Sequence, residues 1–429
     1  MNICYYEDIT DIFYKRTSFE DIESVRAIID HVRDFGDKAV IEYAKQFDRE
    51  ELRELRLSTD EIDRCISMVD GQSMQAIKFA IENVKEFAKK QLSALSNLEV
   101  NIAGNILGHK IIPLDSVGCY VPGGNYPLPS SAIMTITPAK VAGVKRVIAA
   151  SPKIKPVTVA AMKLAGADEI YRIGGVQAIA AMAYGTESIK KVNKIVGPGN
   201  KFVTAAKKMV YGDCGIDFLA GPSEVMIIAD KSANADFVAA DMLAQCEHDK
   251  DARAYLVCFS EEFAQLVEQQ AQKFLKTLPT RAIAQEAFDK SLAIIVSTIE
   301  EAAQIANEKA PEHLELCLNN ASSKADLFRN YGSLFIGNYS AEVYGDYVTG
   351  TNHTLPTNQV SKYTGGLSVF DFVKVQTYQQ VQRSSLSHIA SEASVLAAKE
   401  GLFAHKLAAD IRYPKRLKQV LKKKNSEDE

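Results

Sequence analysis

The most constraining feature of this chain is a short apolar segment that ends in glycine and leads into an alanine-rich helical segment. It recurs between about residues 111 and 210. The repeats are VGCYVPGG before PSSAIMTITPAKVAGV, RVIAAS before PVTVAAMKLAGA, EIYRIGG before VQAIAAMAYGT, and KIVGPGN before KFVTAAKKMV. Strand, turn and helix in this order are typical of a parallel β-sheet with crossover helices, so we predict an α/β fold.

The glycine turns are the predicted border of a binding site, because ligands of open α/β sheets lie beyond the carboxyl ends of the strands. None of the turns matches the G-x-G-x-x-G fingerprint of dinucleotide-binding folds. The nearest one, Gly197-Pro198-Gly199-Asn200, is equally well explained as an ordinary turn.

Other segments extend the pattern on both sides of these repeats. Apolar residues recur at helical spacing near 22–35 and 76–87, and a strand-like VMIIAD precedes a predicted helix at 235–248. A second strand and helix passage spans 252–318, and helices are predicted at about 375–401 and 402–422. A chain of 429 residues has room for about two to four domains.

Charge and hydropathy narrow the class of function. The chain has 50 Lys and Arg against 54 Asp and Glu, so it lacks the basic excess that holds nucleic acid or an anionic membrane. No apolar run reaches the roughly 18 residues of a membrane span, and the acidic N-terminus is unlike a secretory signal. We predict a cytoplasmic protein with a small soluble substrate, and neither a nucleic-acid nor a membrane partner.

The cysteines are scattered and form no CxxC pair. This spacing argues against a disulfide framework and against a cysteine-rich zinc site. We interpret each of them, Cys246 included, as a small buried side chain.

Three polar residues share one face of the helix predicted at 235–248. Asp241, Gln245 and His248 stand at positions i, i+4 and i+7, so their donor atoms can converge. A solvated polar stripe is the alternative explanation, and this segment taken alone favours the stripe.

Glu312 and His313 stand side by side at the beginning of a predicted strand, in PEHLELCL. Alternation puts His313, Glu315 and Cys317 on one face of that strand. An adjacent acid and imidazole suit proton transfer, because histidine titrates near neutrality and a carboxylate can activate water. The alternative is a surface strand with its polar side in water, and this segment alone favours it.

The segment GDYVTGTNHTLPT places Asp346, Asn352 and His353 in a predicted loop. Loops that combine an acid, a histidine and glycine turns more often bind a ligand than merely connect two elements.

A zinc site draws nitrogen, oxygen and sulfur donors from distant segments. His248, Asp346 and His405, with Gln245 as a neutral oxygen donor, would form such a set. Spacing alone does not establish that these side chains meet.

Taken together, these segments resemble the histidinol dehydrogenase family along nearly the whole chain. The motifs that carry the resemblance are VRAIIDHVRDFGDKAV, VGCYVPGGNYPLPSS, IGGVQAIAAMAYGT, KIVGPGNKFV, IDFLAGPSEV, MLAQCEHDKDA, APEHLEL, GDYVTGTNHTLPT, GLSVFDF and EGLFAH. They occur in one order, which makes the joint match far more specific than any single motif.

The resemblance implies an α/β fold with two incomplete Rossmann-like units and mainly parallel sheets, plus small helical N- and C-terminal elements that mediate an intertwined dimer. Residues 1–15 are expected to form an N-terminal arm that packs with the C-terminal region. Residues 16–119 and 223–367 are expected to form the first domain, on the substrate and zinc side. Residues 120–222 would form the second domain, on the NAD side, and 368–429 the dimerisation region.

The resemblance further implies one Zn²⁺ per subunit, which anchors L-histidinol. The implied metal ligands, which also lie against the substrate, are Gln245, His248, Asp346 and His405, the last of these supplied by the partner subunit of a homodimer. The implied remaining substrate contacts are Ser223, His353 and Glu400, besides the catalytic residues Glu312 and His313. Glu400 would suit the cationic amine of histidinol.

In the implied reaction, His313 removes the hydroxyl proton as hydride leaves for NAD⁺, and Glu312 then activates water to attack the aldehyde. A second hydride transfer releases L-histidine. Tyr120, Gln177 and Asn200 match the family's NAD-contacting positions and lie on the predicted glycine turns. NAD is expected to act as an exchanging co-substrate.

Three alternatives stay open at this stage. A related dehydrogenase could act on another small alcohol, such as a sulfonated diol, although Glu400 would repel an anion. A zinc hydrolase with Glu312 as general base would not bind NAD⁺, and the chain lacks an HExxH motif. A purely structural module is the third alternative, but it would not explain the four candidate metal ligands in distant segments.

Overall fold

The computed structural model describes residues 1–16, 23–123 and 126–413. Within these ranges no helix combines the length and the apolar character that crossing a bilayer requires.

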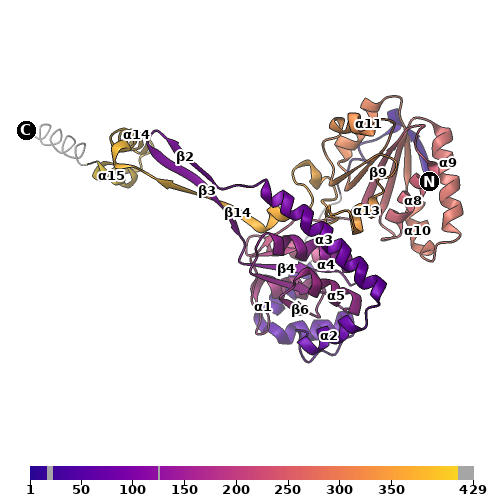
Figure 1. The fold of residues 1–429 in the computed structure, drawn as a ribbon, viewed down its shortest axis with the longest axis horizontal. Coiled ribbons are helices and arrows are strands. Elements are labelled where there is room, and N and C mark those ends of the chain that lie inside the picture. Colours follow the sequence, from indigo (N-terminus) through magenta and orange to yellow (C-terminus); the bar gives the residue numbers. More distant parts are fainter. Residues whose placement is uncertain (17–22, 124–125, 414–429) are drawn as a thin grey trace, which may run out of the picture. The chain divides into compact units, whose positions relative to one another are not determined.

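The described residues fall into two compact units, whose elements are labelled in Figure 1. The first unit comprises Met1–Leu92 and Pro113–Phe372, and the second comprises Ser93–Ile112 and Val373–Glu429. All strands of the two parallel sheets belong to the first unit.

The larger sheet of the first unit has six parallel strands in the order β1-β11-β10-β9-β12-β13. Their bounds are β1 Asn2–Tyr5, β9 Glu224–Ala229, β10 Arg253–Cys258, β11 Leu292–Ile295, β12 His313–Cys317 and β13 Ser333–Ile336. The neighbouring strands β9 and β12 are buried at every position. Such continuous burial is expected where helices cover both faces of a parallel sheet.

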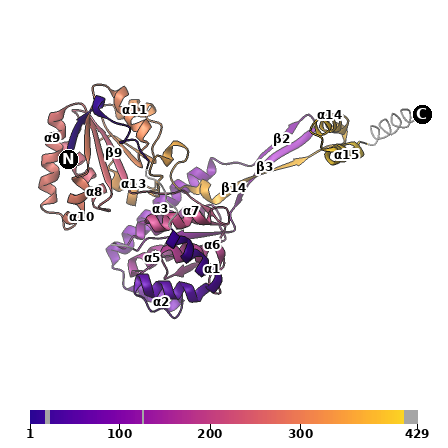
Figure 2. The same ribbon diagram turned by 180° about the vertical axis from the view of Figure 1, so that it is seen from behind.

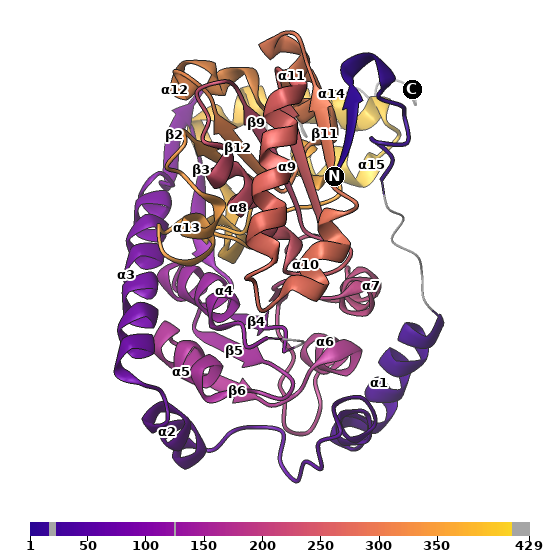
Figure 3. The ribbon, with the colours of Figure 1, turned by 90° about the vertical axis from the view of Figure 1, so that its right-hand side faces the viewer.

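The covering helices divide between two hydrophobic cores. One core contains α8 (Ala235–Cys246), α9 (Glu261–Leu275) and α10 (Arg281–Phe288), and the other contains α11 (Ile299–Lys309). Alternate residues of β9 point into the two cores, so the cores lie on opposite faces of the sheet. Figure 3 shows α9 in front of the strands.

Strand β1 forms one edge of this sheet and pairs with β11 in parallel register. Ile3 packs against one core and Cys4 against the other, and the Met1 amino group lies 2.7 Å from Glu268 Oε1. The arm expected at residues 1–15 thus begins as a strand, because its alternating apolar residues match the sheet edge. Packing of the arm with the C-terminal region stays a prediction.

The smaller sheet of the first unit has five parallel strands in the order β6-β5-β4-β7-β8. Their bounds are β4 Ser116–Tyr120, β5 Arg146–Ala150, β6 Glu169–Tyr171, β7 Lys194–Val196 and β8 Gly215–Ile216. The connecting helices are α4 Pro129–Val141, α5 Pro156–Ala165, α6 Gly175–Tyr184 and α7 Lys201–Val210, several of which are visible in Figure 2. These elements are the predicted repeats, and the α/β fold with mainly parallel sheets is confirmed.

Two helices from the first third of the chain join the smaller sheet. α1 (Glu23–Tyr43) packs on α6, and its Val25 and Val32 lie in the same core as that sheet. α2 (Thr59–Ser67) packs on α5. The expected grouping of residues 16–119 with 223–367 stays a prediction. Helical periodicity specifies which face of a helix is buried, but not which sheet buries it.

The second unit contains a three-stranded sheet in the order β14-β3-β2, with β2 (Leu98–Ile102) antiparallel to β3 (Asn105–Pro113). Helices α14 (Leu386–Lys399) and α15 (Phe403–Arg412) pack together at one end of these strands (Figure 1).

The helix predicted at about 375–401 is wrong in its first part, because β14 spans Val373–Gln380. β-Branched residues in VKVQTYQQ suit a strand, and β3 provides the partner. The helix predicted at 402–422 is present as α15, and its residues beyond 413 lie outside the described part of the chain.

An ion pair connects α2 to the chain just after β6. Arg172 donates to Glu61 Oε1, and the Glu61 carboxylate also accepts from the backbone N–H of Ser58 in a capping box. The hydrogen bond from Arg172, followed by that from Ser58, lowers the pKa of Glu61 to about 2. Above the ordinary glutamate pKa this ionised carboxylate therefore stabilises the folded chain.

We expect Glu61→Gln to lower the free energy of unfolding by about 1–2 kcal/mol at pH 7, because the pair is only partly buried. The difference from wild type should shrink as the pH falls from about 5 toward 2, since wild type then protonates Glu61 as well. Urea unfolding at several pH values measures this difference in the free energy of unfolding. Asp63→Asn, at an exposed acid of the same helix, is the control, and a pH-independent difference would contradict the prediction.

Candidate active site and metal centre

Glu312 and His313 lie at the amino end of β12, between β9 and the edge strand β13 of the larger sheet. Their side chains are almost entirely buried, as is that of Glu315 on the same strand. The surface-strand alternative is therefore wrong, because the polar face of β12 is enclosed by protein. A buried acid and imidazole that lie close together are candidates for catalysis.

The His313 ring is surrounded by carboxylates. Its Nδ1 lies 3.7 Å from Glu342 Oε1 and 3.9 Å from Glu312 Oε2, and its Nε2 lies 3.4 Å from Asp346 Oδ1. Burial alone would lower the pKa of His313, but these carboxylates raise it well above the ordinary value. The imidazole is thus placed to exchange a proton with its surroundings.

The Glu312 carboxylate is held by a backbone contact. Its Oε2 accepts a hydrogen bond from the N–H of Glu224, at 3.0 Å. Burial raises the pKa of Glu312 to about 7, and the nearby His313 opposes this rise. A carboxylate that titrates near neutrality is suited to act as a general base.

A cluster of potential metal ligands adjoins this pair. Ligand atoms of His248, Glu342 and Asp346 all lie within 4.8 Å of one another. With its amide nitrogen directed at Glu342 Oε1, Gln245 donates to it at 2.6 Å, while its oxygen accepts from Glu224 N at 3.0 Å. Two of the predicted ligands, His248 and Asp346, therefore lie together with Glu342, and a third, Gln245, contacts Glu342.

This donor set fits a Zn²⁺ ion. It offers nitrogen and oxygen atoms, and the buried Glu342 Oε2 has no hydrogen-bond partner among the described residues. The structure also corrects the polar-stripe alternative for α8, because Gln245 is fully buried and His248 stands just beyond the end of the helix.

Sequence reasoning missed Glu342. It opens α13 (Glu342–Tyr347) and stands four residues before Asp346, so both carboxylates lie on one face of that helix. This spacing was the signal in the sequence that could have found it.

His353 lies close to the same cluster. Its Nδ1 is 2.8 Å from the carbonyl oxygen of Asp346, so this nitrogen carries the proton, and its Nε2 is 3.5 Å from Ser131 Oγ. Burial lowers the pKa of His353. Asn352 Nδ2 donates to the carbonyl of Met134, at 2.7 Å, which connects the loop to α4.

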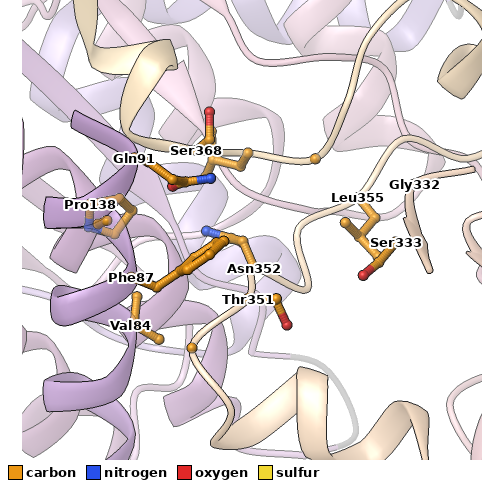
Figure 4. A pocket seen from close by; sticks show the side chains of 14 residues that line it. Val84, Phe87, Gln91, Pro138, Gly332, Ser333, Thr351, Asn352, Leu355 and Ser368 are labelled. Atoms are coloured by element: carbon orange, nitrogen blue, oxygen red, sulfur yellow. The ribbon is translucent and has the colours of Figure 1, made fainter. Parts of the chain in front are cut away.

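A cavity of about 160 Å³ lies on another side of this loop (Figure 4). α3 (Gly71–Ser93) contributes Val84 and Phe87 to its wall, opposite Asn352 and Leu355. None of the predicted catalytic, metal, substrate or NAD residues lines it. The cavity therefore contains no predicted site residue, although its Ser333 pairs with His313 across β13 and β12.

The residues predicted to contact NAD lie at the carboxyl edge of the smaller sheet. Tyr120 ends β4, and its hydroxyl accepts from Gly175 N at 3.1 Å. Gln177 is buried, and neither of its amide atoms has a hydrogen-bond partner among the described residues. Asn200 is exposed and caps α7 through the N–H groups of Phe202 and Val203. The unpaired Gln177 amide suits a polar ligand at this edge.

The remaining predicted site residues are less constrained. Ser223 stands immediately before β9 and is partly buried. Glu400 ends α14 and His405 lies in α15, both exposed and both in the second unit. Their approach to the substrate and the metal stays a prediction.

Cys246 does not take part in this cluster. Its thiol lies 3.8 Å from Ser291 Oγ in the core beside α8. Burial raises the pKa of the Cys246 thiol to about 11, so a small buried side chain is the correct interpretation.

A family model, curated relatives and one solved structure carry the same description. The family model of histidinol dehydrogenase matches residues 15–413. Histidinol dehydrogenase of Bacillus cereus is 45% identical over 395 residues, covering 91% of this chain and 92% of that protein. The Methanococcus maripaludis enzyme is 43% identical, covering 91% and 93%. The crystal structure of histidinol dehydrogenase from Elizabethkingia anophelis has a TM-score of 0.92 and 36% identity, covering 97% and 98%.

Proposed function

Since the chain belongs to the histidinol dehydrogenase family, an oxidoreductase family of histidine biosynthesis, we propose that it is a cytoplasmic, zinc-dependent, NAD-linked four-electron dehydrogenase. It oxidises L-histidinol through L-histidinal to L-histidine. The observation that supports this most strongly is the buried Glu312 and His313 pair beside the cluster of His248, Glu342 and Asp346.

His313 acts as the general base toward the alcohol. In the first oxidation its imidazole accepts the hydroxyl proton, and in the second it accepts the proton of the hydrated aldehyde. Its contacts with Glu342 and Asp346 hold the ring in one orientation and stabilise the imidazolium that forms. NAD⁺, when bound, takes up the hydride in each of the two oxidations.

Glu312 acts as the general base toward water. Its carboxylate removes a proton from the water that attacks the aldehyde, and the N–H of Glu224 keeps that carboxylate in place. Glu312 and His313 are both buried, which limits the access of bulk water. The water that attacks the aldehyde is therefore the one that Glu312 activates.

Gln245, His248, Asp346 and the partner's His405 would hold the metal, with Glu342 next to them. Zn²⁺, when bound, supplies a cation that orients the substrate and offsets the carboxylates around His313. Glu342 orients the Gln245 amide through their hydrogen bond.

Ser223, His353 and Glu400 would complete the substrate site, with Glu400 facing the cationic amine. Tyr120, Gln177 and Asn200 would contact NAD. The fit of NAD rests on the unpaired amide of Gln177 at the carboxyl edge of a parallel sheet.

The proposed homodimer is supported by exposed apolar side chains on α14 and α15. Leu396 is 64% exposed and Phe403 69%. The patch also includes Val395, Leu402, Leu407 and Ile411. Phe403, Leu407 and Ile411 share one face of α15, and exposed apolar side chains on one face are typical of interaction surfaces.

The stoichiometry of the reaction tests the four-electron proposal. We expect two NADH, measured by absorbance, for each histidinol consumed, because the aldehyde is oxidised before it leaves. One equivalent of NADH with free aldehyde in solution would overturn the proposal. A sulfonated diol serves as the control substrate, and it should not react if Glu400 faces the amine.

A further inference from the structure

A buried ion pair lies beneath the turn that follows β7. Lys207 of α7 and Asp217, just after β8, pair with each other, and their side chains are 3% and 0% exposed. Burial of charges costs free energy unless further partners compensate. None of the proposed catalytic steps uses this pair.

Both members of the pair bind the same residue of the turn. Lys207 Nζ donates to the carbonyl oxygen of Gly197 at 2.9 Å, and Asp217 Oδ2 accepts from the N–H of Gly197 at 2.8 Å. The pair therefore fixes both polar backbone atoms of Gly197 at once. We call Lys207 and Asp217 the Gly197 clamp.

The position of Gly197 affects the end of β4. Its φ is +118°, and a Cβ built there would lie 2.1 Å from the carbonyl oxygen of Tyr120. Gly197 thus touches the backbone of one proposed NAD contact and stands three residues before another, Asn200. A shift of Gly197 would move both contacts relative to each other.

We propose that Lys207 and Asp217 are positioning residues for the dinucleotide. The inference rests on the proposed function, in which Tyr120, Gln177 and Asn200 contact NAD. The clamp does not touch the dinucleotide. It keeps the turn at 197–200 and the end of β4 in the arrangement that the dinucleotide needs.

Lys207→Met and Asp217→Asn test the proposal through NADH binding, measured by fluorescence titration of the zinc-loaded enzyme. Each variant should raise the Kd for NADH about tenfold, because an unpaired buried group lets the turn shift. The KM for NAD⁺ should rise in the same proportion, whereas the KM for histidinol and the zinc content should not change. A merely structural role would not produce this split.

A lysine that lies on the strand just before the turn, and not in the clamp, provides the matched control. Lys194 of β7 pairs with Asp371 Oδ1 at 3.0 Å and donates to the Asp371 carbonyl at 2.9 Å, away from the turn at 197–200. Lys194→Met should therefore bind NADH as wild type does.

Should the single variants fail to fold, the double variant Lys207→Met/Asp217→Leu removes both charges and leaves neither unpaired. It should still bind NADH about tenfold more weakly, because no side chain then holds Gly197. Wild-type NADH affinity in a folded clamp variant would overturn the proposal.

Gln177→Ala separates this inference from the proposed function. If Gln177→Ala weakens NADH binding and the clamp variants do not, only the positioning role fails. If neither Gln177→Ala nor the clamp variants weaken it, the proposed NAD site fails, and the positioning role with it.

Discussion

Replacing Glu312 by glutamine is expected to halt the reaction at the aldehyde, so that NADH formed per histidinol falls from two to one. The amide cannot take a proton from water, although its oxygen can still accept from Glu224 N. Loss of a general base slows its step by on the order of 10² to 10⁴-fold. Initial NADH absorbance and trapping of the aldehyde with a hydrazine measure the two oxidations separately.

The second oxidation should also depend on pH in wild type. Glu312 must be ionised to act as a base, and burial raises its pKa to about 7. The rate with added histidinal should therefore rise as the pH increases through about 7, and this rise should be absent from Glu312→Gln. Glu300→Gln, at an exposed position of α11, should behave as wild type. Two NADH at the wild-type rate from Glu312→Gln would exclude the role of this carboxylate.

Loss of a metal-binding histidine is expected to remove zinc and activity, and mixed dimers are expected to restore part of both. His248→Ala and His405→Ala should each lose zinc and lower the rate by at least about 100-fold. If the partner supplies His405, a mixed dimer of the two variants contains one site with both histidines. An equimolar mixture, unfolded and refolded together, should then regain about a quarter of the wild-type activity, since about half of the dimers are mixed.

A histidine elsewhere in the second unit controls for this experiment. His388, exposed in α14, is outside the proposed site, so His388→Ala should be active without mixing. Zinc analysis of the refolded mixture should show the same fractional recovery as activity. A mixture with no recovery, although mass spectrometry detects mixed dimers, would place both histidines in one subunit.

Local sequence patterns predicted correctly those elements whose structure depends on their own residues and not on a distant partner. The glycine turns and alanine-rich helices predicted the strands and helices of the smaller sheet. The pattern was less informative at residues 373–380, because a polar strand needs a partner such as β3 to be preferred over a helix.

The candidate site shows the same limit. Local patterns favoured a solvent-exposed polar stripe for the helix that carries Gln245 and precedes His248. They likewise favoured a surface strand, with its polar side in water, for Glu312 and His313. Gln245, Glu312 and His313 are buried, whereas His248 is exposed. β12 lies between β9 and β13, an order that no local pattern contains. Glu342 was missed for a related reason, since an acid on a short helix gains meaning only beside Gln245 and His313.

The residue patterns are enough to predict the α/β class, the glycine turns of the smaller sheet and, through the motifs, the family. The place of the acid and imidazole pair, at the amino edge of the larger sheet, depends on how the strands are ordered in space. There the ends of α8 and α13 bring further donors to it. The physical reason is that crossover helices run back along parallel strands, so residues far apart in the chain meet at one edge.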